Sequence, residues 1–126
     1  MFTILLLEDE KDLGLTISEN LTDENQTCEL FYNCNSALLT IKKRSFDIYI
    51  LDINLTDGDG LEFATLILSQ YPSAPIIFIS ANSDPELRLK GLELGAFDFI
   101  NKPFTLKELQ IKILRIKKEL NQFKTQ

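Results

Sequence analysis

The hydrophobic and polar positions of this chain fall into two alternating patterns. Short runs that are almost wholly apolar have the length and β-branched content of strands buried on both faces. Between them, apolar residues return every three or four positions, which is typical of amphipathic helices. The patterns predict strands at residues 2–7, 27–32, 48–51, 76–80 and 97–100, and helices at residues 11–21, 36–43, 61–70, 84–94 and 105–122.

Capping residues mark several helix ends. Asn35 is a candidate N-cap for the second helix. Asp84 precedes Pro85, which favours a helix start with proline at the first helical position. Gly95 supplies a C-terminal stop for that helix, and residues 105–108 (Thr-Leu-Lys-Glu) form a capping box that opens the last one.

Strands that alternate with helices across short connections predict a parallel sheet covered on both faces. Right-handed crossovers are expected for such units. The predicted fold class is therefore α/β, a flavodoxin-like (βα)5 doubly wound sandwich with strand order 2-1-3-4-5. Its switch point lies between the first and third strands. Residues 1–126 are expected to form one domain.

The third strand ends at a carboxylate, Asp52, and an Asp- and Gly-rich loop follows it. Ligands of open parallel sheets bind outside the carboxyl ends of the strands, so Asp52 is expected at the functional edge. The alternative is a polar turn in which Asp52 only hydrogen-bonds its own backbone. This stretch alone leaves both interpretations open.

Composition and charge narrow the class of protein. The chain has no histidine and its two cysteines have no metal-ligand spacing, so neither a zinc site nor a disulfide scaffold is expected. No apolar run approaches the roughly 20 residues of a membrane span, and the N-terminus lacks the basic region of a signal peptide. We therefore expect a cytoplasmic protein with no membrane partner. Seven basic and two acidic residues follow position 101, but a solvated amphipathic helix explains them better than nucleic-acid binding.

Polar side chains follow four of the predicted strands. Each has an ordinary explanation, as a helix cap, a strand end or a turn, but topology brings all of them to one edge. Three carboxylates at one place repel each other unless a cation neutralises them, and Mg²⁺ suits such oxygen ligands. A lysine at the same edge can bind a phosphoryl oxygen. The residues are Glu8, Asp9, Asp52, Ser80 and Lys102.

The chemistry implied is phosphoryl transfer to a carboxylate. Asp52 would attack in line, while Mg²⁺ and Lys102 stabilise charge on the equatorial oxygens.

Four stretches, in this order and at these spacings, resemble the receiver domain of two-component response regulators. The similarity covers nearly the whole chain. The stretches are residues 7–10, 52–62, 79–81 and 95–104.

This resemblance implies a role for each matching residue. Asp52 would accept a phosphoryl group from a histidine kinase, and Lys102 would contact that group. The Lys102-Pro103 peptide bond is expected to be cis. Asp9, Asp52 and the backbone carbonyl of Asn54 would bind Mg²⁺, with Glu8 acting mostly through water. Ser80 would be the switch hydroxyl and Phe99 the switch aromatic, while Asn54 and Asn82 occupy positions that tune dephosphorylation. Such a protein is no enzyme beyond self-phosphorylation and autodephosphorylation.

Three residues depart from the usual pattern of the family. Glu8 replaces the commoner Asp, which should preserve metal binding. Thr56 stands where proline is usual, which predicts a less rigid loop. Phe99 replaces the common Tyr and has no hydroxyl to offer a partner.

The resemblance also predicts how the signal would leave the site. Ser80 would turn toward the phosphoryl group, and the vacated space would draw Phe99 inward. This motion would bias a surface formed by the fourth helix, the fifth strand and the fifth helix, with both states populated before phosphorylation.

That surface resembles the dimer face of OmpR/PhoB-type receivers. Its apolar patch is formed by Leu89, Leu92 and Ile111. Its cross-subunit ion pairs would be Arg88 with Glu108 and Asp98 with Lys112, although Phe97 replaces one acidic member usual in that branch. We expect phosphorylation to promote a homodimer and to control a DNA-binding output domain that lies outside these 126 residues. The alternative is a stand-alone phosphorelay protein with a protein target.

Three other functions fit the residues poorly. A haloacid-dehalogenase-type phosphatase needs an acidic group two residues after its nucleophile, where this chain has Asn54. A flavodoxin-type binder needs a phosphate loop after the first strand, where residues 8–10 would repel phosphate. A calcium loop starting at Asp52 places Asp57 where glycine belongs and Phe63 where a bidentate Glu belongs.

Overall fold

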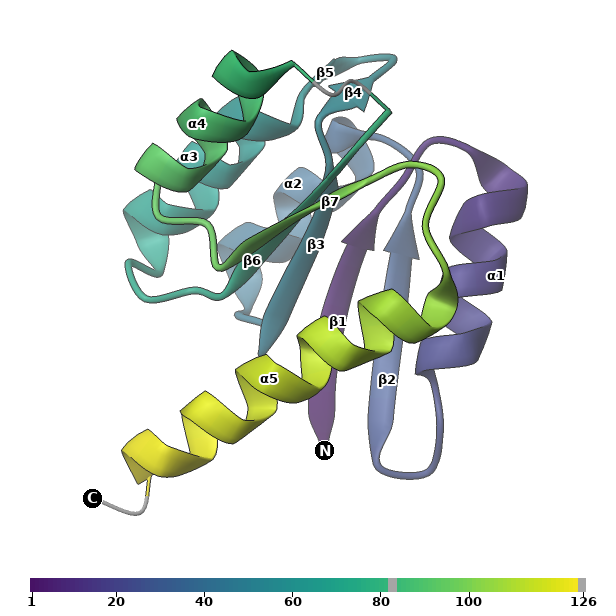
Figure 1. The fold of residues 1–126 in the computed structure, drawn as a ribbon, viewed down its shortest axis with the longest axis vertical. Helices are drawn as coiled ribbons and strands as arrows, with labels where there is room; N and C mark the ends of the chain where they lie inside the picture. Colours follow the sequence, from purple (N-terminus) through teal and green to yellow (C-terminus); the bar gives the residue numbers. More distant parts are fainter. Residues whose placement is uncertain (82–83, 125–126) are drawn as a thin grey trace.

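A computed structural model describes residues 1–81 and 84–124 of the chain, with side chains of the last helix described as far as Asn121. Five parallel strands form one sheet in the order β2-β1-β3-β6-β7, which confirms the predicted topology (Figure 1). The strands are β1 (Phe2–Leu7), β2 (Gln26–Phe31), β3 (Ile48–Asp52), β6 (Ile76–Ser80) and β7 (Asp98–Asn101).

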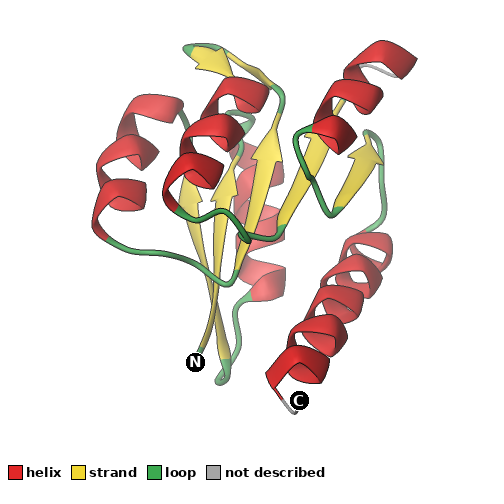
Figure 2. Cartoon of the chain, turned by 90° about the vertical axis from the view of Figure 1, so that its left-hand side faces the viewer, coloured by secondary structure: helices red, strands yellow, loops and turns green. Residues whose placement is uncertain are grey.

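Five helices cover the sheet, as predicted. They are α1 (Lys11–Leu21), α2 (Cys34–Lys43), α3 (Gly60–Gln70), α4 (Pro85–Glu93) and α5 (Leu106–Lys124). Helices α2, α3 and α4 lie on one face of the sheet, and α1 and α5 lie on the other (Figures 1 and 2). Within the two described ranges, none of the helices combines the length and the apolar character that a membrane crossing needs.

The pleat of the strands divides the core into two layers. In β1, Leu5 and Leu7 pack under α2 and α3, while Ile4 and Leu6 pack under α1 and α5. All four side chains are fully buried. Both faces of a central parallel strand are covered, so its sequence is an apolar run rather than an alternating pattern.

The structure confirms several boundaries and corrects others. Asp84 accepts a hydrogen bond from the Glu86 N–H at 3.0 Å and caps α4, and Gly95 has a φ of 101°, as its role after that helix requires. The predicted N-cap of α2 was wrong. Asn33, not Asn35, caps that helix by accepting a 2.8 Å hydrogen bond from the Ser36 N–H. Strand β2 begins one residue earlier than predicted and β7 begins one residue later.

The loop after Asp52 contains a small hairpin that the sequence did not predict. Its strands are β4 (Asn54–Leu55) and β5 (Gly58–Asp59), which pair antiparallel. Helix α3 then begins at Gly60, against the end of β3. A Cβ at Gly60 would lie 2.2 Å from the Asp52 carbonyl oxygen, so only glycine fits here.

Candidate functional site

Three carboxylates meet at the carboxyl edge of the sheet. Glu8 follows β1 directly, Asp9 is the next residue, and Asp52 ends β3. One oxygen from each lies within 4.8 Å of the others. Glu8 and Asp52 are buried, while Asp9 is half-buried. The predicted acidic cluster is therefore assembled in three dimensions.

Lys102 supplies the positive charge of the site. Its Nζ lies 2.9 Å from Asp52 Oδ2, 2.9 Å from Glu8 Oε1 and 3.9 Å from Glu10 Oε2. The Lys102 N–H donates to the Ser80 carbonyl at 2.8 Å, and the predicted cis Lys102-Pro103 bond is confirmed. Burial disfavours the charged ammonium, but the carboxylates outweigh burial and raise the pKa of Lys102.

Glu8 is a buried carboxyl group whose charged form is disfavoured by its surroundings. Burial raises the pKa of Glu8 to about 7, although Lys102 and a 3.0 Å hydrogen bond from the Glu10 N–H oppose the shift. Among the described residues, Glu8 Oε1 has no hydrogen bond of good geometry, in spite of its short distance to Lys102 Nζ. A buried oxygen short of partners, beside two more carboxylates, fits a divalent cation with oxygen ligands.

Asp52 makes both kinds of contact that the sequence left open. Its Oδ1 accepts a 3.0 Å hydrogen bond from the Asn54 N–H, which is the local turn, and its Oδ2 accepts one from Lys102 Nζ. The local turn therefore does not exclude a functional role. It orients the carboxylate, and Lys102 holds its second oxygen.

Ser80 is the last residue of β6, and Phe99 lies on the neighbouring strand β7. Ser80 is buried at the end of β6 and pairs with Asn101 of β7. Asn82, at a position expected to tune dephosphorylation, lies outside the described residues.

Phe99 already lies inward in this structure. Its side chain is 3% exposed, and its ring centroid lies 6.2 Å from that of Phe78. The Arg88 guanidinium lies 5.7 Å from the same ring. Gly91 of α4 allows this packing, because a Cβ there would lie 3.0 Å from Phe78 and 3.4 Å from Phe99. The resemblance predicts that Phe99 moves inward after phosphorylation. In this structure the ring is already buried.

The predicted dimer residues lie on the surface of α4, β7 and α5. Leu89, Leu92 and Ile111 are each about half exposed. Asp98 Oδ2 binds Lys112 Nζ at 2.9 Å within the chain, with Arg115 3.7 Å away. This pair thus forms without a second subunit. The roles of Arg88 and Glu108 in a dimer stay predictions.

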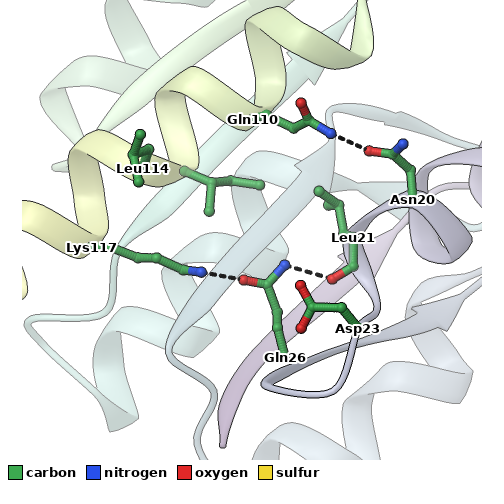
Figure 3. A pocket seen from close by; sticks show the side chains of 8 residues that line it. Asn20, Leu21, Asp23, Gln26, Gln110, Leu114 and Lys117 are labelled. Atoms are coloured by element: carbon green, nitrogen blue, oxygen red, sulfur yellow. Dashed lines mark hydrogen bonds between the residues drawn. The ribbon is translucent and has the colours of Figure 1, made fainter.

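A hollow of about 220 Å³ between α1 and α5 contains none of the predicted site residues. Lys117 donates to the Gln26 side chain, which donates in turn to the Leu21 carbonyl, and Gln110 donates to Asn20 (Figure 3). These bonds join α5 to β2 and α1. They secure the helix pair on the face away from Phe99 rather than form part of the acidic cluster.

The family described as response regulator receiver domain matches residues 4–114. The chain is 32% identical to the transcriptional regulatory protein CreB of Escherichia coli over 123 residues, which cover 98% of this chain and 54% of CreB. It is 38% identical to the response regulator ArlR of Staphylococcus epidermidis over 113 residues, covering 90% of this chain and 51% of ArlR. The chain thus spans about half the length of these curated relatives.

Solved structures show the same architecture. The non-phosphorylated HemR receiver domain of Leptospira biflexa has a TM-score of 0.87 at 36% identity, covering 92% of this chain and 94% of that one. The BeF3-activated DrrB receiver domain has a TM-score of 0.84 at 29% identity, covering 94% and 98%. DrrB of Thermotoga maritima is described as an OmpR/PhoB homologue. By sequence and by fold, this chain belongs to the family of response regulator receiver domains.

Proposed function

We propose that Asp52 accepts a phosphoryl group from a histidine kinase and that Mg²⁺ is required for the transfer. The observation that carries this proposal is the contact between Asp52 Oδ2 and Lys102 Nζ beside the carboxylates of Glu8 and Asp9. A nucleophilic oxygen, a cation for the phosphoryl group and a set of metal ligands thus lie at one edge of the sheet.

Each residue has a defined part in the transfer. Glu8, Asp9 and Asp52, with the carbonyl of Asn54, would hold the cation, which supplies charge neutralisation for the phosphoryl oxygens. An Asp52 oxygen forms a bond to phosphorus while the phosphorus–nitrogen bond of the kinase phosphohistidine breaks, and the electron pair of that bond stays on the imidazole nitrogen. Lys102 then pairs with a phosphoryl oxygen. We infer that the domain catalyses no reaction beyond its own phosphorylation and dephosphorylation.

Phosphorylation would act on the surface of α4, β7 and α5. A phosphoryl group adds about −1.5 to −2 charges and three acceptors, which draws the Ser80 hydroxyl toward it. Because Phe99 already packs inward, we infer that phosphorylation stabilises an arrangement that the resting protein samples. Such a coupling is typically about 1–3 kcal/mol.

The output would be dimerisation through Leu89, Leu92 and Ile111, followed by transcriptional control through a DNA-binding domain. CreB is named a transcriptional regulatory protein, and this chain matches about half of its length. This similarity supports the proposed transcriptional output. Such a regulator would act in the cytoplasm.

Incubation with acetyl phosphate and Mg²⁺ tests the acceptor. We expect intact mass to show one added phosphoryl group in the wild-type protein and in Asp59→Asn, and none in Asp52→Asn. Asp59 is a matched control because it is a nearby carboxylate that caps α3. A phosphoryl group that persists in Asp52→Asn, or that never forms on the wild-type protein, would contradict the proposal.

A further inference from the structure

The turn that joins β4 to β5 contacts the acidic cluster directly. The Thr56 backbone N–H donates a hydrogen bond to Asp9 Oδ2 at 3.1 Å, across 47 positions of sequence. Proline, the residue expected at this position by resemblance, has no N–H to donate. The contact therefore requires a residue other than proline at position 56, and threonine meets that requirement.

The next residue anchors the same turn to a helix. Asp57 Oδ1 accepts from the Cys34 N–H at 2.9 Å, and Asp57 Oδ2 accepts from the Asn35 N–H at 3.1 Å. These N–H groups begin α2 and have no partner within the helix. They lower the pKa of Asp57, with Cys34 the largest cause. A charged carboxylate is thus well placed at a helix N-terminus.

We propose that the Thr56 N–H is a positioning group that orients Asp9 for a divalent cation, and that Asp57 holds the turn so that this N–H points at Asp9. This inference rests on the magnesium site of the proposed function. A carboxylate has about four acceptor positions, so one N–H leaves the others available to a cation. Hydrogen bonds to metal-binding carboxylates typically contribute about 10–100-fold to metal affinity.

The variant Thr56→Pro separates this inference from its main rival. If the turn served only through its rigidity, proline would stiffen it and Mg²⁺ would bind equally well or more tightly. If the N–H positions Asp9, proline removes the donor and Mg²⁺ binds less tightly. Thr56→Ala is the matched control, because alanine removes the side chain and keeps the N–H.

Mg²⁺ affinity is best measured by amide NMR titration of the purified chain. We expect Thr56→Pro to weaken binding by about tenfold, the low end for such contacts because Thr56 is exposed. Thr56→Ala should bind as the wild-type protein does. Asp57→Ala should also weaken binding, and Asp57→Asn, which keeps a carbonyl acceptor, should recover part of the loss.

The two positions should not be additive. Because Asp57 acts through the Thr56 N–H, adding Asp57→Ala to Thr56→Pro should weaken binding no further. A metal-free readout checks the contact itself. Asp9→Ala should shift the Thr56 amide proton upfield, whereas Glu10→Ala should leave it in place.

Several results would overturn the inference. Thr56→Pro binding Mg²⁺ as tightly as the wild-type protein, or more tightly, would do so. Additive losses of Mg²⁺ affinity in the double variant would also do so, as would a Thr56 amide shift that does not change in Asp9→Ala. These results leave the proposed function intact when the wild-type protein still binds Mg²⁺ and takes phosphate on Asp52. A wild-type protein that binds no Mg²⁺ would overturn both this inference and the magnesium part of the proposed function.

Discussion

Lys102 Nζ lies 2.9 Å from Asp52 Oδ2, although the two residues are separated by 50 positions and by strand β6. Asp52, the proposed acceptor, thus already contacts the lysine ammonium that would pair with an incoming phosphoryl oxygen. The same ammonium lies 2.9 Å from Glu8, so one positive charge faces two buried carboxyl groups. The stability of the resting protein and the proposed phosphoryl transfer would therefore both depend on Lys102.

Replacing Lys102 with methionine should destabilise the metal-free protein. Glu8 and Asp52 would remain buried without a cation, and the loss of one partner from a buried pair costs about 3–5 kcal/mol. Urea denaturation at pH 7 measures the free energy of unfolding. Lys118→Met, at an exposed position of α5, should change it by less than about 0.5 kcal/mol. Equal stability of the two variants would show that the lysine does not hold the cluster together.

Stability should fall as pH rises through the range set by Glu8. The pKa of Glu8 is 4.5 for an ordinary carboxyl and about 7 when folded, so the folded state binds more protons between these values. The stabilisation is complete below pH 4.5 and is lost as pH rises toward 7. The expected loss is about 3 kcal/mol for a shift of this size.

Urea denaturation across that range measures how the free energy of unfolding changes with pH. This slope should be shallower for Glu8→Gln, and it should equal the wild-type slope for the exposed Glu19→Gln. Saturating Mg²⁺ should flatten the wild-type slope, because a cation favours the ionised carboxylate. A wild-type slope retained in Glu8→Gln would assign the pH dependence to other groups.

Gly60→Ala should lower the free energy of unfolding by about 3 kcal/mol or more. Its Cβ would lie 2.2 Å from the Asp52 carbonyl oxygen, which is backbone and cannot turn aside. Gly58→Ala is the matched control in the same loop, since its Cβ would meet the Cys34 side chain at 3.1 Å. Thermal unfolding should show a small change for Gly58→Ala. Similar melting temperatures for the two variants would mean that α3 can withdraw from β3.

Ile111→Asp should prevent dimerisation after activation while leaving phosphorylation of Asp52 unchanged. Ile111 is 51% exposed on α5, so a charge there costs little in the monomer but would be desolvated in an apolar interface. Analytical ultracentrifugation with beryllofluoride and Mg²⁺ measures the association. Leu39→Asp, on the exposed side of α2, should dimerise like the wild-type protein. A dimer that survives Ile111→Asp would place the interface elsewhere.

Predictions based on local sequence were incomplete where the outcome depends on residues of another element. Asn33 and Asn35 can both cap a helix, and nothing in their immediate sequence separates them. The choice depends on Asp57, which lies 22 positions beyond Asn35 and binds the first two N–H groups of α2. Phe99 was likewise placed on the correct strand, but its burial depends on the absence of a side chain at Gly91 in a different element.

The order of the strands and the gathering of Glu8, Asp9, Asp52 and Lys102 at one edge could be predicted from the amino-acid sequence. Apolar periodicity identifies the elements, and the connection rules for parallel sheets then bring the strand ends together. Three features required the folded chain: the unsatisfied oxygen of Glu8, the bond from Thr56 to Asp9, and the pairing of Asp98 with Lys112 inside one molecule. Each depends on distances of a few ångströms between segments far apart in the chain, which only side-chain packing determines.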